Sequence, residues 1–242
     1  PSEGEASQPE VLASVPLPFR AKELALSPDK TFAAVAMDRG KLQVFTLPDL
    51  ALEKSVDNHL GVGYDISSVA ISPDSRLLAY GSEGGGVHVW NRESDETITV
   101  VSPVANETRS PYRKFNTGAV CFSLDGSRLF TGRGFSQPAH DLGNIFHWTD
   151  NFFGVQWFDT DSWEELGNTS STHGPIQDIE AKPTKVIVAA GETIFKTASS
   201  VRMQSCNTGG TSLYTLSVAS PQLGIEYSLE GGPSILSLAG DS

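Results

Sequence analysis

Short apolar or alternating segments recur along the chain, and each is bounded by Gly, Pro, Asp or Ser. Examples lie at residues 76–80, 87–90, 119–122 and 186–190. A period of two is typical of half-buried strands, whereas no stretch of about twelve residues keeps the 3.6-residue period of an amphipathic helix. The pattern therefore predicts an all-β protein.

The chain also repeats itself. Ser-Pro-Asp at residues 27–29 recurs at residues 72–74, and the apolar and glycine positions around both copies match in the same register. Ser-Leu-Asp-Gly follows at residues 123–126, and degenerate copies begin at Lys182 and Ser220. In such a turn Pro fixes φ and Asp bonds to neighbouring backbone amides. Repeats of about 40–50 residues with about four strands each are typical of propeller blades.

We therefore expect a β-propeller of four-stranded antiparallel blades, with about five blades in this chain. The predicted boundaries are a polar acidic tail at residues 1–9 and a propeller at 10–242, with blades near 20–57, 64–102, 117–168, 174–206 and 212–242. Two arrangements stay open. The ring is incomplete, or residues 11–15 pair with residues 234–238 and close it, which would protect the edge strands.

The third repeat is longer than the second and holds an insertion at residues 133–153. Its aromatic residues are Phe135, Phe146, Trp148, Phe152 and Phe153. Long loops on a rigid scaffold are preferred binding sites, and aromatic side chains are the usual anchors of interfaces. We predict that these five residues bind a partner. The alternative is a β-hairpin that packs its own aromatic side chains on the blade.

Three segments of the second repeat carry a family resemblance. Val-Ala-Ile-Ser-Pro-Asp at residues 69–74, Leu-Leu-Ala-Tyr-Gly-Ser at 77–82 and Val-His-Val-Trp-Asn at 87–91 resemble a blade of the WD-repeat family. The resemblance covers residues 20–191 and implies a propeller with a role in protein–protein interaction. Trp90-Asn91 and Phe158-Asp159 stand where the family has Trp-Asp, so its Asp–His–Ser–Trp network is not implied here.

Charge and cysteine content narrow the possible partners and the compartment. Lys and Arg number 17 against 29 Asp and Glu, which gives a net charge of −12 and disfavours binding to nucleic acid or anionic lipid. No apolar run approaches the ~18 residues of a membrane-spanning helix, so no membrane insertion is expected. Two cysteines, Cys121 and Cys206, are too few for a disulfide-stapled scaffold. They favour reduced thiols in a cytoplasmic protein, although one bridge between them is the alternative.

Candidate catalytic and metal-binding residues are sparse. His140, Asp141, His147 and Asp150 suit a metal by residue type, but their spacing matches no ligand motif. The acidic segment 159–165 lacks the turn glycine of a calcium loop. Nucleophile-elbow, phosphate-loop and zinc-protease motifs are absent from the sequence. We therefore expect no cofactor, no metal and no catalytic residue.

Three functions are compatible with these features. The one we favour is a non-catalytic interaction scaffold that binds other proteins within a multi-subunit complex. The alternative is a propeller enzyme of the lactonase or glycosidase type, with a polar or metal site at the channel mouth. Glu23, Asp65 and Asp178, at comparable positions near the inner strands, are its candidate residues. A purely structural subunit is the third possibility.

Overall fold

The computed structural model describes residues 10–57, 65–82, 85–102, 114–115, 117–136, 138–141, 145–148, 152–169, 176–190, 195–199, 202–206, 211–217 and 223–229. Within these ranges the regular elements are strands, apart from one short 3-10 turn at Asp38–Gly40. No helix in the described ranges is long and apolar enough to cross a membrane. The predicted all-β class is confirmed.

Four antiparallel sheets carry the fold, and we call them the first to fourth blades. The first contains β1 (Ala21–Leu26), β2 (Phe32–Met37), β3 (Lys41–Thr46) and β4 (Leu52–Asp57). The second contains β5 (Ile66–Ile71), β6 (Leu77–Ser82), β7 (Val87–Asn91) and β8 (Thr97–Val101). The third contains β10 (Val120–Phe122), β11 (Arg128–Ser136), β14 (Phe152–Asp159) and β15 (Glu165–Asn168), with β9 (Lys114–Phe115) paired to β11. The fourth contains β16 (Ile176–Ala181), β17 (Lys185–Ala190), β20 (Thr211–Ser217) and β21 (Leu223–Leu229).

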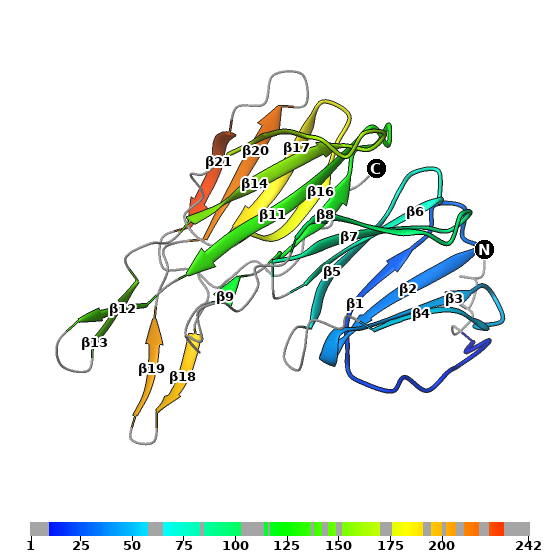
Figure 1. The fold of residues 1–242 in the computed structure, drawn as a ribbon, viewed down its shortest axis with the longest axis horizontal. Coiled ribbons are helices and arrows are strands. Elements are labelled where there is room, and N and C mark those ends of the chain that lie inside the picture. Colours follow the sequence, from blue (N-terminus) through cyan, green and yellow to red (C-terminus); the bar gives the residue numbers. More distant parts are fainter. Residues whose placement is uncertain are drawn as a thin grey trace, which may run out of the picture.

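Two further hairpins interrupt the third and fourth blades. They are β12 (Pro138–Asp141) with β13 (Ile145–Trp148), and β18 (Phe195–Ser199) with β19 (Arg202–Cys206). Each lies between the second and third strands of its blade in chain order. The blades themselves follow one another as a fan, from the blue first blade to the fourth blade, whose strands run from yellow to orange-red in Figure 1. Their first strands β1, β5, β10 and β16 contact each other in that order, so they form the inner side of an incomplete propeller.

The described residues form about four blades rather than the expected five. The predicted fourth and fifth blades share one sheet, because β20 pairs with β17 across the whole of that strand. The hairpin at 195–206, which the sequence assigned to blade strands, is a separate insertion. Residues 11–15 are not a strand, and Val11 and Leu12 are 81% and 83% exposed. Their proposed partner, residues 234–238, lies outside the described residues.

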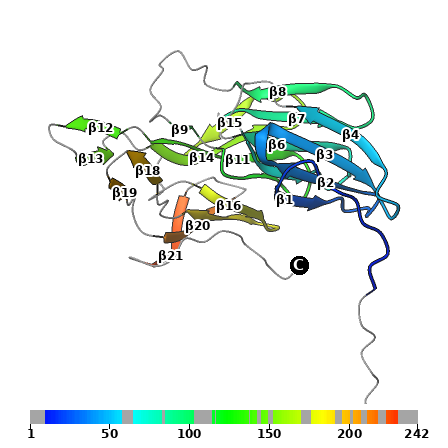
Figure 2. The same ribbon diagram turned by 90° about the horizontal axis from the view of Figure 1, so that it is seen from below.

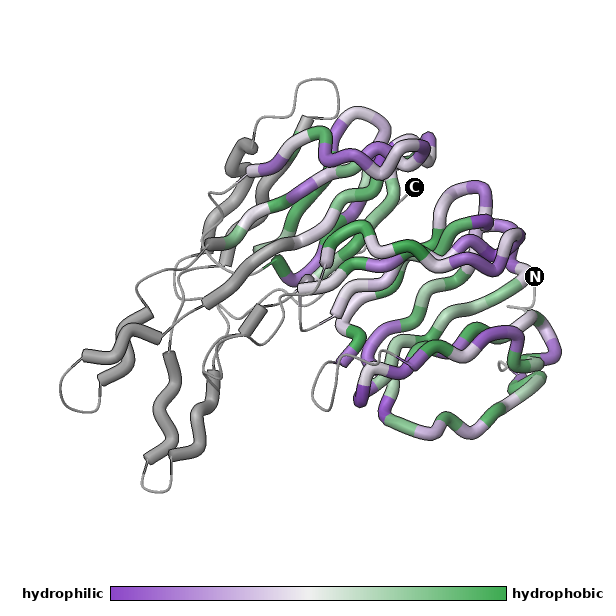
Figure 3. Tube along the Cα trace, in the orientation of Figure 1, coloured by the Kyte–Doolittle hydropathy of each residue, from purple (hydrophilic) through white to green (hydrophobic). Residues whose placement is uncertain are grey.

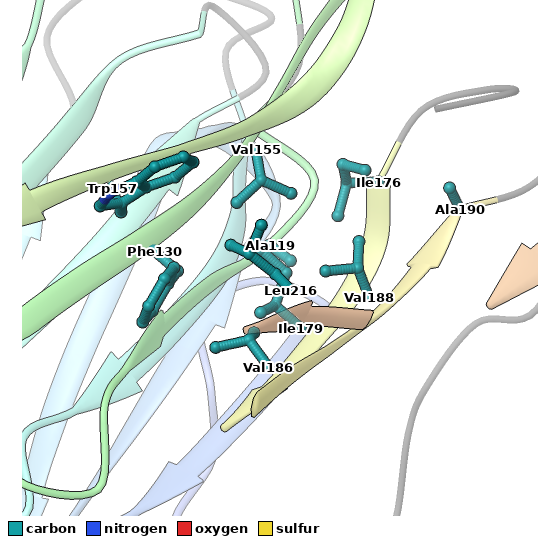
Figure 4. Close-up of a cluster of buried hydrophobic side chains, with 10 residues drawn as sticks. All are labelled: Ala119, Phe130, Val155, Trp157, Ile176, Ile179, Val186, Val188, Ala190 and Leu216. Atoms are coloured by element: carbon teal, nitrogen blue, oxygen red, sulfur yellow. The ribbon is translucent and has the colours of Figure 1, made fainter. Parts of the chain in front are cut away.

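Apolar side chains fill each gap between successive blades. Figure 3 shows that hydrophobic residues concentrate on the strands, whereas the turns are hydrophilic. Figure 4 shows the gap between the third and fourth blades, where Phe130 and Trp157 face Ile179, Val186 and Leu216. Equivalent clusters join the first blade to the second and the second to the third. Burial of apolar surface between neighbouring sheets is therefore the force that stacks the blades.

The repeated Ser-x-Asp turn has the same hydrogen bonds in three blades. In the second blade, Ser72 Oγ donates to Asp74 Oδ1 at 2.6 Å and accepts from the Leu77 amide at 2.9 Å. Ser27 with Asp29 and Ser123 with Asp125 repeat this arrangement. The fourth blade has Lys-Pro-Thr at 182–184 instead, and its turn is closed by the Lys182 amide bonding to the Lys185 carbonyl at 2.8 Å.

These turn bonds favour the ionised carboxylates. The hydroxyl of Ser27 and then the amide of Thr31 lower the pKa of Asp29 to about 2. The hydroxyl of Ser123 likewise lowers the pKa of Asp125. A depressed pKa in the folded state stabilises the fold above the unfolded pKa of 3.8, and this stability is lost as the pH falls through the folded pKa.

We predict that the free energy of unfolding falls as the pH decreases from about 4 to about 2. In Asp29→Asn the fall is smaller, because one carboxylate no longer has to be protonated in the folded state. Urea titrations at a series of pH values measure this dependence. Asp161→Asn, at an exposed turn position, is the control and should follow the wild type. If the free energy of unfolding of Asp29→Asn depended on pH as steeply as that of the wild type, the lowered pKa of Asp29 would be contradicted.

A close backbone approach joins the third and fourth blades. A Cβ on Gly118 would lie 1.7 Å from the Ile176 carbonyl oxygen, and a Cβ on Gly132 would lie 2.6 Å from the Ile176 Cβ. Side chains cannot occupy these two positions unless the blades move apart. The two glycines therefore set the spacing of the blades at this point.

We predict that Gly118→Ala destabilises the protein by about 1–3 kcal/mol, as overpacking of a core does. Ser55→Ala, at an exposed position of β4, is the control and should have almost no effect. Chemical denaturation monitored by tryptophan fluorescence measures both. Equal stabilities for the two variants would show that the blades are not in such close contact.

Candidate protein-interaction site

The predicted insertion of the third blade is a β-hairpin at the end of two long strands. β11 and β14 pair continuously from Arg128–Asp159 to Phe135–Phe152. Beyond that last pair the chain continues into β12 and β13, which pair with each other. The long central strands of the blade thus form the base of the hairpin.

The five predicted contact residues occupy three different settings. Phe135 and Phe152 form the last pair of β11 and β14, and Phe135 is also paired with Phe115 of β9. Phe146 and Trp148 lie at alternate positions of β13. Phe153 is only 5% exposed and is a core side chain of the blade.

The fourth blade carries a second hairpin that the sequence did not reveal. β18 and β19 fall within residues 174–206, which the sequence analysis predicted to be one blade. The Gly-Gly at residues 209–210, directly before β20, was the available signal that the blade resumes there. We call β12, β13, β18 and β19 together the two-hairpin arm.

The two hairpins of the arm lie side by side. β13 contacts β19, and Figures 1 and 2 both show the hairpins projecting from the same end of the blades. Adjacent blades thus place two insertions, distant in sequence, next to each other. A partner that approaches this end meets both hairpins together.

The two histidines of the first hairpin have different cross-strand partners. His147 is paired with Ala139, and His140 is paired with Phe146. Asp150 lies outside the described residues. Among the side chains that the structure describes, no group of three or more His, Cys, Asp or Glu residues could hold a metal ion.

The acidic segment after β14 is an ordinary turn. Asp159 Oδ1 accepts hydrogen bonds from the amides of Ser162 at 2.8 Å and Asp161 at 3.1 Å, and from the Ser162 hydroxyl at 3.0 Å. These bonds lower the pKa of Asp159, the Ser162 amide contributing most. The carboxylate therefore organises the local backbone.

Polar side chains of the inner strands link one blade to the next. Glu23 Oε2 accepts a hydrogen bond from the Val69 amide at 2.8 Å, and Ser68 Oγ accepts one from the Val120 amide at 2.9 Å. Glu23, Ser68 and Asp178 each follow a register irregularity at the start of their inner strand, so they are equivalent positions. In the fourth blade, Asp178 Oδ1 bonds to the amide of its neighbour Ile179 at 2.9 Å.

The three candidate acids of the enzymatic alternative are thus separated into two environments. Desolvation raises the pKa of Glu23 to about 7, the Val69 amide opposes the rise, and the charge of Asp178 adds to it. Asp65 instead bonds to Lys22 Nζ at 2.6 Å and to the Arg39 amide at 2.5 Å. Glu23 and Asp178 are close enough to interact electrostatically, whereas Asp65 belongs to an ion pair.

Burial also raises the pKa of Cys121 to about 12, which keeps this thiol protonated.

We predict that Glu23 makes stability depend on pH near neutrality. A raised carboxyl pKa stabilises the fold fully below the unfolded value of 4.5, and this contribution is lost as the pH rises through about 7. Glu23→Gln keeps an oxygen acceptor for the Val69 amide and removes the ionisation. Its free energy of unfolding should stay level between pH 5 and pH 8, where that of the wild type declines. The same decline in both proteins would disprove this role of Glu23.

Part of the chain is similar to known proteins. The WD40 family (WD domain, G-beta repeat) matches residues 52–91. The human protein "Apoptotic protease-activating factor 1" is 33% identical over 66 residues, which is 27% of this chain. The chain spans 5% of the length of that relative.

The matched segment begins in the outer strand of the first blade and ends in the third strand of the second. It contains β4, β5, β6 and β7, so the sequence repeat and the sheet are out of phase by one strand. The family match at 52–91, the repeated Ser-x-Asp turns and the four-stranded sheets all indicate the same architecture. The chain is a WD-repeat-like β-propeller.

Proposed function

We propose that this chain is a protein-interaction scaffold that binds its partner through the two-hairpin arm. The WD40 match supports a role in protein interaction in general. The observation that carries the finer proposal is the side-by-side placement of two hairpins from adjacent blades. Each inserts at the same point of its blade, so the rigid stack of sheets holds both at one end.

The contact residues that we propose lie on β13 and at the base of its hairpin. Phe146 and Trp148 are the principal candidates, because aromatic side chains contribute the most binding energy per residue in protein interfaces. Phe135 and Phe152 mark the junction of the hairpin with the blade. Phe153 would act indirectly, since its buried side chain fixes the strand that follows the hairpin. Binding within a multi-subunit complex and a cytoplasmic location stay predictions.

The enzymatic alternative is favoured by one observation. Burial and the negative charge of Asp178 raise the pKa of Glu23 to about 7. Carboxyl groups that titrate near neutral pH suit acid–base catalysis. The same carboxyl already accepts a hydrogen bond from the Val69 amide across the gap between two blades. This hydrogen bond gives Glu23 a structural role that needs no substrate, so the scaffold is the function we favour.

The test replaces residues 136–151 by Asn-Gly, which joins Phe135 to Phe152 by a two-residue turn. We expect the melting temperature to stay nearly unchanged, because β11 and β14 remain paired up to Phe135 and Phe152. Proteins that co-purify with the wild type, identified by mass spectrometry, should be lost. Phe146→Ala with Trp148→Ala should reproduce the loss.

Leu124→Ala is the matched control, since Leu124 is an exposed apolar residue in a turn of the third blade, outside the arm. It should retain the partners. A turn replacement that folds and still binds the same proteins would refute the assignment of the arm. A variant that cannot fold would show that the hairpin belongs to the core of the blade.

A further inference from the structure

Basic side chains gather at the start of the first blade. Arg20 Nε donates to Asp38 Oδ2 at 3.1 Å, and Lys22 Nζ lies 2.6 Å from Asp65 Oδ2 and 3.7 Å from Asp38 Oδ1. Burial opposes the ionisation of Asp65, but hydrogen bonds from Lys22 and the Arg39 amide, together with the charge of Arg20, lower its pKa. The two carboxylates are therefore ionised at neutral pH and are shared among several basic residues.

The guanidinium of Arg39 adds a third positive charge to this group. It lies over the Phe19 ring, 5.0 Å from the ring centroid, whereas the backbone amide of Arg39 donates to Asp65. In the described part of the chain Arg39 belongs to no ion pair. The side chain of Arg20 is 76% exposed, and Arg39 is exposed as well. We call Arg20, Lys22 and Arg39 the basic cluster.

The segments that adjoin the cluster in sequence add no acid. Residues 11–19 lead into Arg20, residues 58–64 lead into Asp65, and neither segment contains Asp or Glu. Three cations thus accompany two carboxylates. The net positive charge of the cluster contrasts with the net charge of −12 for the whole chain.

The basic cluster lies at the same end of the blades as the two-hairpin arm. Asp38–Gly40 joins the second strand of the first blade to the third, and the two hairpins occupy this connection in the third and fourth blades. Antiparallel strands alternate in direction, so this connection and the start of the inner strand share one end of each blade. The inner strands contact one another along the fan, which keeps corresponding ends together.

The acidic turns lie at the opposite end. The Ser-x-Asp turns join first to second strands, and the Asp159 turn joins a third strand to a fourth. Hydroxyl and amide donors lower the pKa values of Asp29, Asp125 and Asp159, so these carboxylates are ionised at neutral pH. They place negative charge at the end away from the arm. An acidic partner is therefore repelled from the turn end and attracted to the basic cluster.

We propose that the basic cluster binds a carboxylate-rich segment of the protein partner that the arm holds. This inference rests on the proposed function, because it assigns a chemical class to the same partner. Guanidinium groups pair with carboxylates through two parallel N–H···O bonds, and Arg20 and Arg39 both present exposed guanidiniums. Lys22 neutralises Asp38 and Asp65, which would otherwise repel an incoming acid. The contact orients the partner toward the arm end of the fan.

The test uses a fluorescein-labelled hexaglutamate peptide, and fluorescence anisotropy measures its binding at low and high salt. The wild type should bind the peptide and release it as the salt concentration rises, since exposed charges are screened. Arg20→Gln with Arg39→Gln should weaken binding at least about tenfold, because two charged contacts are removed. Lys30→Gln with Arg76→Gln removes the same charge from the turn end and is the matched control. It should bind as the wild type does.

Hexaglutamate binding needs no partner, so this experiment tests the basic cluster separately from the arm. A wild type that does not bind the peptide, or a double arginine variant that binds it as tightly as the wild type, would overturn the proposal. So would tighter binding of a hexanucleotide, which would indicate a nucleic-acid ligand. Arg39→Gln alone breaks no described ion pair, so it should fold and show part of the loss.

Co-purification then distinguishes the two assignments. If the variant with residues 136–151 replaced keeps its co-purifying proteins and still binds hexaglutamate, the arm assignment fails and the basic cluster stands. If that variant loses those proteins while the double arginine variant keeps both them and the peptide, the basic cluster fails and the arm stands. Loss of both the proteins and the peptide in the double arginine variant is the result we expect.

Discussion

The central strands β2 and β6 of the first two blades are apolar and buried on both faces, so these strands need cover from both sides. β2 illustrates the constraint, because all six of its residues are buried although they alternate between two faces. A single four-stranded sheet cannot cover itself, and the neighbouring sheet therefore becomes part of its core. The fan of blades, the close approach at Gly118 and the inter-blade hydrogen bonds of Glu23 and Ser68 all follow from this requirement.

Sequence patterns predicted the parts of the fold that depend on local chemistry. The Ser-x-Asp turns at 27–29, 72–74 and 123–125 were predictable because their hydrogen bonds form within a few residues. The insertion at 133–153 was visible because the third repeat is longer than the second. The boundary between a fourth and a fifth blade was not predictable, since β18 and β19 look like blade strands and only pairing of β17 with β20 excludes them.

The structural settings of the five candidate contact residues could not be predicted from the sequence. Residue type alone did not distinguish Phe153, which is buried, from Phe146, which lies on the hairpin. The second hairpin was missed because its proximity to the first arises from the stacking of two blades. Glu23 and Asp178 were noted from their positions, but the raised pKa of Glu23 depends on burial between blades, which no single sequence reports.

The one-strand offset between the matched segment at 52–91 and the sheets has a mechanical consequence. β4 closes the first blade, yet it belongs to the same repeat as the three inner strands of the second. Local unfolding of that repeat would remove the edge strand of the first sheet and three strands of the second. The first and second blades should therefore unfold together rather than one at a time.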